Sequence, residues 1–432
     1  MAALALIGAL VLAPGFAAAQ RLPPIQGPGT IPDLPRTPPL GGILGGIERT
    51  RQDRLDDTTR LLDTAREGVR ALEEERIARL RDLVRAHPEA LEMTRLGPAV
   101  RGQVLAIDAD SAALAAAAEA GFAILEQEAI EGLDLRTAIL AVPRGMSVER
   151  ALRRLRRIAP RIEFAANHLH VQSGAAGAAG GALAQGGGAG GAAVGIIDGG
   201  VAAHPAIRGP VRQRGFARGA PRPSGHATAI ASLIAGSGMV RGVAPGTTLI
   251  VADVYGADPA GGNALALARA LGWMAAQRVS VVAVSLVGPP NPLVARAVAQ
   301  ARGRGLHIVA AVGNDGPAAP PAYPASYPGV IAVTGVDARN RPLPEAGRAL
   351  HLDYAAPGAD MAAATENGRL GAVRGTSYAV PFVAGRLVRQ LSGGGIAALD
   401  AEVDPRGGRG RGRGVICGDC RTPIGNARAS RD

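Results

Sequence analysis

The middle of the chain constrains the fold most strongly. Between residues 194 and 390, short and almost wholly apolar runs alternate with alanine-rich stretches of helical length. Strands that are apolar on both faces need cover on both faces, which is typical of a parallel sheet with helical connections. The sequence therefore predicts an α/β domain over 194–395. Its apolar runs are V-G-I-I-D, L-I-V-A-D-V, V-S-V-V-A-V-S-L, L-H-I-V-A-A-V-G-N and V-I-A-V-T-G-V.

The N-terminal part of the chain changes character several times. Residues 1–19 are expected to be a secretory signal peptide, because an apolar run ends at Ala17-Ala18-Ala19, although no positive charge precedes it. Residues 20–46 are rich in Pro and Gly and are expected to be an extended tether. Residues 47–99 are predicted to be an amphipathic helical segment, from apolar residues at helical spacing among charged ones. Surface packing is the simple expectation for this helix, and a coiled coil is the alternative.

Three further segments complete the organisation. Residues 100–172 show the order β-α-β-β-α-β, which predicts a small ferredoxin-like α+β domain. Residues 173–193 are almost entirely Gly and Ala, so we expect an unpacked linker that is open to proteolysis. Residues 396–432 are expected to be an Arg/Gly-rich tail.

Four polar residues stand where apolar runs end or helices begin. Each has an ordinary structural explanation, as a turn residue, a core histidine or a helix cap. The carboxyl edge of a parallel sheet is also where α/β proteins hold their sites, and the order Asp, His, Ser is a known order for catalytic triads. The sequence therefore predicts a hydrolytic site. The residues are Asp198, His226, Asn314 and Ser377.

Residues 193–390 resemble the subtilisin-like serine peptidases, the subtilases. The resemblance implies a subtilisin-like parallel sheet with helices on both faces and a serine endopeptidase activity. It also implies that Ser377 is the nucleophile, His226 the proton carrier and Asp198 the group that orients the imidazole. Asn314 is then an oxyanion donor together with the backbone N–H of Ser377. The motifs, in family order, are I-I-D-G-G-V, G-H-A-T-A-I-A-S-L-I-A-G, V-V-A-V-S-L-V-G, A-A-V-G-N-D-G, Y-P-A-S-Y-P-G-V-I-A-V-T-G-V-D, A-A-P-G and G-T-S-Y-A-V-P-F-V-A-G.

The same resemblance implies how substrate binds and how the enzyme matures. Protein or peptide substrates in extended conformation would pair with an edge segment and a facing glycine-rich segment. Residues 100–172 stand where the family carries a propeptide, which chaperones folding and inhibits the cleft. We therefore expect an exported zymogen (secreted, periplasmic or at the cell surface) that is cleaved within 171–193. The implied substrate contacts are Ser285, Leu286, Val287, Gly288, Gly261 and Gly313.

Some residues depart from the family pattern. Ala227 follows the histidine where the family usually has Gly, and its methyl group is expected to press on the neighbouring strand and tilt His226. Val380 and Phe382 replace a smaller and a more polar residue. These departures motivate the alternative of a catalytically weak or inactive binding or scaffold protein on the same fold.

Charge and composition exclude several other classes. The net charge is +11, and all 47 basic residues are Arg. Without Lys the chain cannot be a P-loop NTPase, a kinase, a pyridoxal-phosphate enzyme or a Ser-Lys hydrolase. The charge and the Arg-Gly run at 406–414 motivate a third alternative, an exported Arg-rich adhesin or nucleic-acid binder. Nucleic acid is not expected, because that run lacks interleaved aromatics. No further segment has the uninterrupted apolar length of a membrane span.

No metal or cofactor site is predicted. His168 and His170 share one strand face, but no clear third ligand stands near them in the sequence. Calcium is common in the family, yet no Asp/Asn-rich loop identifies its ligands. For Cys417 and Cys420 we expect a short disulfide rather than a redox or zinc site.

Overall fold

The structure is a computed structural model that describes residues 67–68, 70–172, 182–184, 192–404 and 410–425. The chain divides by its internal contacts into residues 1–62 and 63–432, and all described residues belong to the second unit. The predicted signal peptide, the tether and the first part of the helical segment lie outside the described residues.

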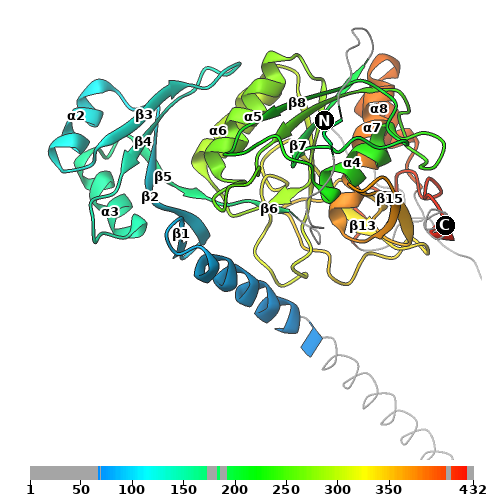
Figure 1. The fold of residues 1–432 in the computed structure, drawn as a ribbon, viewed down its shortest axis with the longest axis horizontal. Coiled ribbons are helices and arrows are strands. Elements are labelled where there is room, and N and C mark those ends of the chain that lie inside the picture. Colours follow the sequence, from blue (N-terminus) through cyan, green and yellow to red (C-terminus); the bar gives the residue numbers. More distant parts are fainter. Residues whose placement is uncertain (1–66, 69, 173–181, 185–191, 405–409, 426–432) are drawn as a thin grey trace, which may run out of the picture. The chain divides into compact units, whose positions relative to one another are not determined.

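The central element is a seven-stranded sheet in which every pairing is parallel (Figure 1). This confirms the α/β prediction. Five strands coincide with the five apolar runs, and they are β7 (Ala193–Asp198), β9 (Thr248–Asp253), β10 (Val281–Val284), β12 (His307–Ala311) and β13 (Ile331–Val336). Two more strands, β8 (Val211–Gly215) and β14 (Tyr354–Pro357), close the edges in the order β14-β13-β12-β10-β7-β9-β8.

Helices cover both faces of this sheet. The side chains of a strand alternate between the two faces, so Ile196 of β7 packs with α4 and α7 while Ile197 packs with α5 and α6. Small residues, mostly Ala, let these helices approach the sheet closely. The helices are α4 (Gly225–Ala235), α5 (Ala264–Ala276), α6 (Pro292–Gly303) and α7 (Val380–Gln390).

The domain also holds shorter elements. β15 (Met361–Ala364) and β16 (Leu370–Val373) form an antiparallel hairpin, and β11 (Leu286–Val287) follows β10 directly. The short helix α8 (Ile396–Ala401) follows α7 through the turn η2 (Leu391–Gly393). In the described part of the chain, no helix combines the length and apolar character needed to cross a bilayer.

The N-terminal part folds as an antiparallel sheet with two helices on one face. Its strands and helices follow in the predicted order β-α-β-β-α-β, and the sheet order is β3-β4-β2-β5. The second face packs against α5 and α6, since Leu105, Ile139 and Ala165 share a core with those helices. The elements are β2 (Gly97–Ile107), α2 (Ser111–Glu119), β3 (Ile124–Ala129), β4 (Arg136–Ala141), α3 (Val148–Ile158) and β5 (Glu163–His168).

The helical prediction for 47–99 is wrong at its C-terminal end. Helix is present over 70–86, but β1 (Leu91–Thr94) is a strand that pairs with the first residues of β2. The helix packs by its apolar face, because Leu83 and Val84 contact a cluster that includes Leu169. This is the ordinary surface packing expected of an amphipathic helix.

The described residues of the Gly/Ala linker are packed, although an unpacked linker was expected. Leu183 bridges Ala202, and Ala184 is buried and donates its N–H to Val201. The C-terminal segment is likewise packed: Val415 pairs with Ala355 and shares a small core with it. Both segments therefore belong partly to the α/β domain.

Candidate active site

Asp198 and His226 form the buried centre of the site. Asp198 is the last residue of β7, at the carboxyl edge of the sheet, and His226 lies in the first turn of α4, whose N-cap is Ser224. Nδ1 of His226 lies 2.8 Å from Oδ2 of Asp198, and both side chains are fully buried. With the carboxylate ionised, Nδ1–H donates this bond and Nε2 is left as the basic nitrogen. The predicted pair is therefore brought together.

A second aspartate, which sequence reasoning missed, lies beside this pair. Asp253 ends β9 in register with Asp198, and its carboxylate accepts backbone N–H groups from Arg222, Tyr255 and Gly256 at 2.7–2.9 Å. Burial raises the pKa of Asp253. Its role is to fix the loop that forms one wall of the site. The signal in the sequence was the motif V-A-D at the end of a predicted strand.

Ser377 lies in a tight turn before α7. The turn η1 (Thr376–Tyr378) follows Gly375, whose φ of 139° favours glycine. Ser377 is no helix cap, because its hydroxyl donates instead to the carbonyl of Ser285 at 3.3 Å. Nε2 of His226 is buried and has no hydrogen-bond partner in the described residues. Ser377 and His226 are both buried, and the ring of Tyr378, the residue after the serine, lies 5.3 Å from the imidazole ring, centroid to centroid.

Asn314 is tied to the segment that carries Ser377. Its Oδ1 accepts the backbone N–H of Thr376 at 2.8 Å, and the hydroxyl of Thr376 donates to the carbonyl of Gly313 at 3.1 Å. Gly313 has φ +89°, so a glycine is needed to turn the chain here. Because the oxygen of the amide is held, the orientation of its NH₂ group is fixed as well.

The edge segment pairs with an extended part of the chain's own N-terminal domain. β6 (Val171–Gln172) is antiparallel to β11, with Val171 opposite Val287 and Gln172 opposite Leu286. On the other side, the N–H of His170 donates to the carbonyl of Gly262 at 2.7 Å. Residues 169–172 therefore lie between β11 and the loop that holds Gly262 and Asn263, as an extended peptide would.

Two of the implied substrate contacts lie in the cleft without pairing their backbone with the extended segment. Gly288 exchanges two backbone hydrogen bonds with Tyr323, and its missing side chain lets Leu169 and His170 approach closely. Gly261 lines the cavity, but the backbone bond to the extended segment is made by Gly262. Ser285 instead accepts the hydroxyl of Ser377, as described above.

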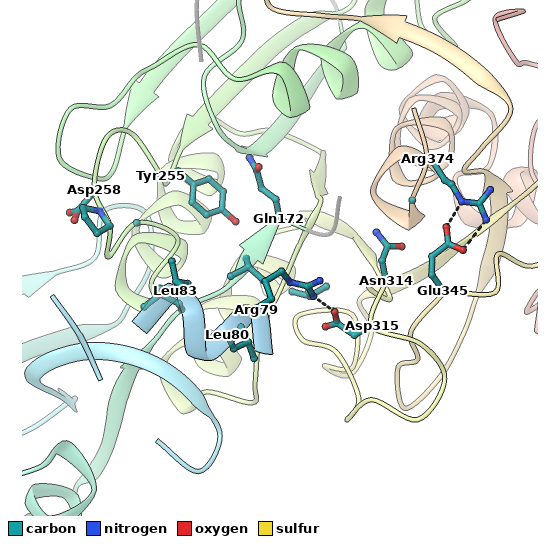
Figure 2. A pocket seen from close by; sticks show the side chains of 16 residues that line it. Arg79, Leu80, Leu83, Gln172, Tyr255, Asp258, Asn314, Asp315, Glu345 and Arg374 are labelled. Carbon is teal, nitrogen blue, oxygen red and sulfur yellow. Dashed lines mark hydrogen bonds and ion pairs between the residues drawn. The ribbon is translucent and has the colours of Figure 1, made fainter. Parts of the chain in front are cut away.

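A cavity of about 840 Å³ opens along the cleft. Figure 2 shows Arg79, Leu80 and Leu83 of the N-terminal helix on one side of it, with Asn314 and Asp315 across from them. Arg79 forms an ion pair with Asp315. Farther along, Arg374 and Glu345 form a second ion pair at 2.7 Å. The cavity thus has an apolar part lined by leucines and a charged part near Asn314.

The residues that depart from the family pattern fit into the core. Ala227 is fully buried and packs with α4 and its neighbours, while the Asp198–His226 distance stays at 2.8 Å. The expected tilt of His226 away from Asp198 is therefore wrong. Val380 and Phe382 are also fully buried in the same core.

The histidine pair at the end of β5 and just before β6 is buried and packed into the fold. Nε2 of His168 lies 3.2 Å from the hydroxyl of Thr94, and burial lowers the pKa of His168 to about 4. Burial also lowers the pKa of His170 to about 3, and its ring contacts the backbone at Gly288. Among the described residues, the one cluster with metal-ligand chemistry is Cys417, Asp419 and Cys420. Its two sulfurs form the expected disulfide, which occupies them.

The fold and the site together define a class of enzyme, the α/β serine peptidases. A sequence model of the subtilase family matches residues 189–394. Subtilisin BL of Lederbergia lenta is 35% identical over 208 residues, which make up 46% of this chain and 76% of the relative. The chain therefore belongs to the subtilase family and is a subtilisin-like serine peptidase.

Other relatives add detail. The major intracellular serine protease of Bacillus subtilis (strain 168) is 34% identical over 173 residues, 38% of this chain and 54% of that protein. Fervidolysin from Fervidobacterium pennivorans, a keratinolytic enzyme related to subtilisin, superposes with a TM-score of 0.60 at 18% identity. That likeness of fold covers 76% of this chain and 62% of fervidolysin, so it extends beyond residues 189–394.

Proposed function

We propose that the protein is an exported serine endopeptidase that uses Asp198, His226 and Ser377 as its catalytic triad. Ser377 attacks the scissile carbonyl, and His226 takes its proton and returns it to the leaving amine. Asp198 holds Nδ1 of His226 protonated and stabilises the imidazolium. The observation that carries this proposal is the buried 2.8 Å contact between His226 and Asp198, together with the placement of Ser377 in the turn η1 that precedes α7.

Asn314 and the backbone N–H of Ser377 are proposed to form the oxyanion hole. The bond from Thr376 to Oδ1 of Asn314 supports this, because it directs the amide NH₂ away from Thr376. A donor fixed before the reaction stabilises the developing negative charge without reorganising. These roles need no cofactor, and we assign no calcium ligands.

Substrates are proposed to be proteins or peptides in extended conformation. The support is β6, which already pairs with β11 through its backbone. Ser285, Leu286 and Val287 line one side of the bound peptide in this proposal, and Gly262 lies on the other. Gly261 and Gly313 contribute shape to the cleft rather than backbone pairing. Backbone pairing selects for an unfolded substrate segment more than for particular side chains.

The N-terminal domain, residues 100–172, is proposed to be a propeptide that inhibits its own catalytic domain until cleavage within 171–193. The support is that residues 169–172 lie along the cleft, so substrate binding requires their departure. Ion pairs also join the two domains, as Arg269 of α5 contacts Glu126 and Glu128 of β3.

Export is proposed from the apolar residues 1–19 together with the disulfide, which persists in oxidising compartments. The mature enzyme would be secreted, periplasmic or at the cell surface. Residues 20–46 would then be a tether and 47–86 a helical extension of the propeptide. Arg413, near the end of the Arg-Gly run, pairs with Asp400 at 2.7 Å, so the described end of that run serves the fold rather than nucleic acid.

Replacing Ser377 with Ala tests self-maturation. The full-length Ser377→Ala protein should accumulate unprocessed, whereas the parent chain yields a shorter product whose N-terminus lies within 171–193. Normal processing of the Ser377→Ala protein would rule out self-cleavage by Ser377. The alternative of an inactive scaffold predicts no processing by either protein.

A further inference from the structure

The side chain of Gln172 reaches the catalytic carboxylate. Its Nε2 donates to Oδ1 of Asp198 at 2.8 Å, while Oδ2 of the same carboxylate takes His226. Figure 2 shows Gln172 directed into the cleft. Asp198 is fully buried and Gln172 is half-buried, and a hydrogen bond to a carboxylate oxygen is stronger than one between neutral groups.

The amide end of Gln172 lies next to the carboxylate of Asp198 and the backbone of Gly199. Gly199 donates its N–H to the same Oδ1 at 2.7 Å. A Cβ on Gly199 would lie 2.6 Å from Cβ of Ser224 and 3.8 Å from Nε2 of Gln172. Oδ1 of Asp198 thus accepts both the N–H of Gly199 and the amide of Gln172, and the side chain of Ser224 lies directly beside Gly199.

The strand register places this contact relative to the bond that is cut. Val171 pairs with Val287 and Gln172 with Leu286, so the next residue of a bound peptide would face Ser285. The carbonyl of Ser285 accepts the hydroxyl of Ser377 at 3.3 Å. The residue after the glutamine position is thus the one that presents its carbonyl carbon to the nucleophile.

We propose that this peptidase selects glutamine as the second residue before the cleaved bond, because a glutamine there donates its amide to Asp198. The proposal rests on the proposed function of Ser377 and names a substrate preference for the same site. Asparagine keeps the amide but is one methylene too short to reach. Methionine has the length but no donor, and glutamate would set a second carboxylate against Asp198.

Peptides that copy residues 169–176 test this, with Gln, Asn, Met or Glu at the position of Gln172. Their kcat/KM values are measured on matured enzyme whose active fraction is titrated with a fluorophosphonate probe. A hydrogen bond to a charged group should favour Gln over Asn and Met about tenfold or more, and over Glu by more still. Equal kcat/KM values for the Gln, Asn and Met peptides would overturn the proposed preference. If the enzyme is still labelled by the fluorophosphonate probe, the proposed function stands.

A second experiment tests the contact of Gln172 with Asp198 without relying on catalysis. In the full-length Ser377→Ala protein, hydrogen exchange of the β6 and β11 amides is compared for Gln172→Asn, Gln172→Met and Gln172→Glu. The proposal predicts faster exchange in all three variants, with Gln172→Glu the fastest. Unchanged protection in all three would overturn it. Failure of fluorophosphonate labelling alone would instead count against the proposed function.

Discussion

Nδ1 of His226 lies 2.8 Å from Oδ2 of Asp198, although the residue after the histidine is Ala227. The methyl group of Ala227 is buried in the core between α4 and its neighbours and leaves this contact intact. The departure from the family pattern at this position is therefore compatible with an assembled site. This relationship separates an active peptidase from the scaffold alternative and can be tested directly.

Ala227→Gly should raise kcat by no more than about twofold, since the imidazole is already in contact with its carboxylate. The change should lower the free energy of unfolding by about 1 kcal/mol, because glycine in a helix is less favourable than alanine. Steady-state kinetics and urea unfolding measure the two effects. A tenfold or greater gain in kcat would mean that the methyl group displaces His226.

Asn314 can be tested with a matched pair of variants. Asn314→Ala should lower kcat about 100- to 1000-fold with little change in KM, the loss that subtilisin itself shows when one oxyanion donor is removed. Asn314→Asp keeps an oxygen to accept the N–H of Thr376 but replaces the NH₂ donor with an acceptor. It should therefore preserve stability better than Ala, yet lose at least as much activity. Near-normal turnover of Asn314→Asp would contradict the proposed role.

The sequence predicted the parallel sheet because its strands are apolar on both faces, as in Val281–Val284. It failed for β8, whose alternation of Arg and Gln suits a polar edge strand and resembles a loop. It also failed for Leu183, since one apolar residue in a Gly/Ala run carries no periodic signal. These elements are specified by their partners in space, not by local pattern.

The residues of the site were predicted only where they stand in a local sequence motif. Asp198, His226, Asn314 and Ser377 stand in recognisable local motifs, so their chemistry could be inferred. Gln172 lies in a strand of two residues, and its contact with Asp198 depends on the docking of another domain. Asp253 ends a predicted strand, but the backbone donors that it binds include Arg222, whose approach depends on the folded loop rather than on a local motif.

The buried histidines predict how the precursor responds to pH. Burial lowers the pKa of His168 to about 4 and that of His170 to about 3 from 6.5, with Glu149 opposing the shift at His168. As pH falls below about 6.5, the unfolded chain takes up these protons before the folded one does. Stability present above that pH is therefore lost towards pH 4, by up to about 1.4 kcal/mol per pH unit for each histidine.

Urea unfolding of the Ser377→Ala precursor at pH 7.5, 6 and 5 measures this slope. His170→Leu should flatten it, because one of the two buried groups no longer titrates. His87→Gln, at a half-exposed histidine of the same N-terminal part, is the matched control for the loss of one histidine. A precursor that is equally stable at pH 5 and pH 7.5 would contradict this prediction.

The two domains are held together partly by Arg269. Its guanidinium bonds the carboxylate of Glu128 at 2.8 Å and that of Glu126 at 2.6 Å. Arg269→Ala should speed the release of the cleaved N-terminal domain about three- to tenfold, the scale of a partly exposed ion-pair network. Gel filtration after processing measures the release. Arg144→Ala, at an exposed arginine of the N-terminal domain, is the control, and an equal effect of both changes would mean that Arg269 has no specific role.

The central claim is that Ser377 is a nucleophile activated by His226 and Asp198. Fluorophosphonate labelling of the matured protein, followed by mass mapping of the labelled peptide, tests it most directly. We predict one label, on Ser377, which is lost when His226 is replaced with Ala. Absence of label on Ser377 in a folded and processed protein, or label that persists without His226, would contradict the account.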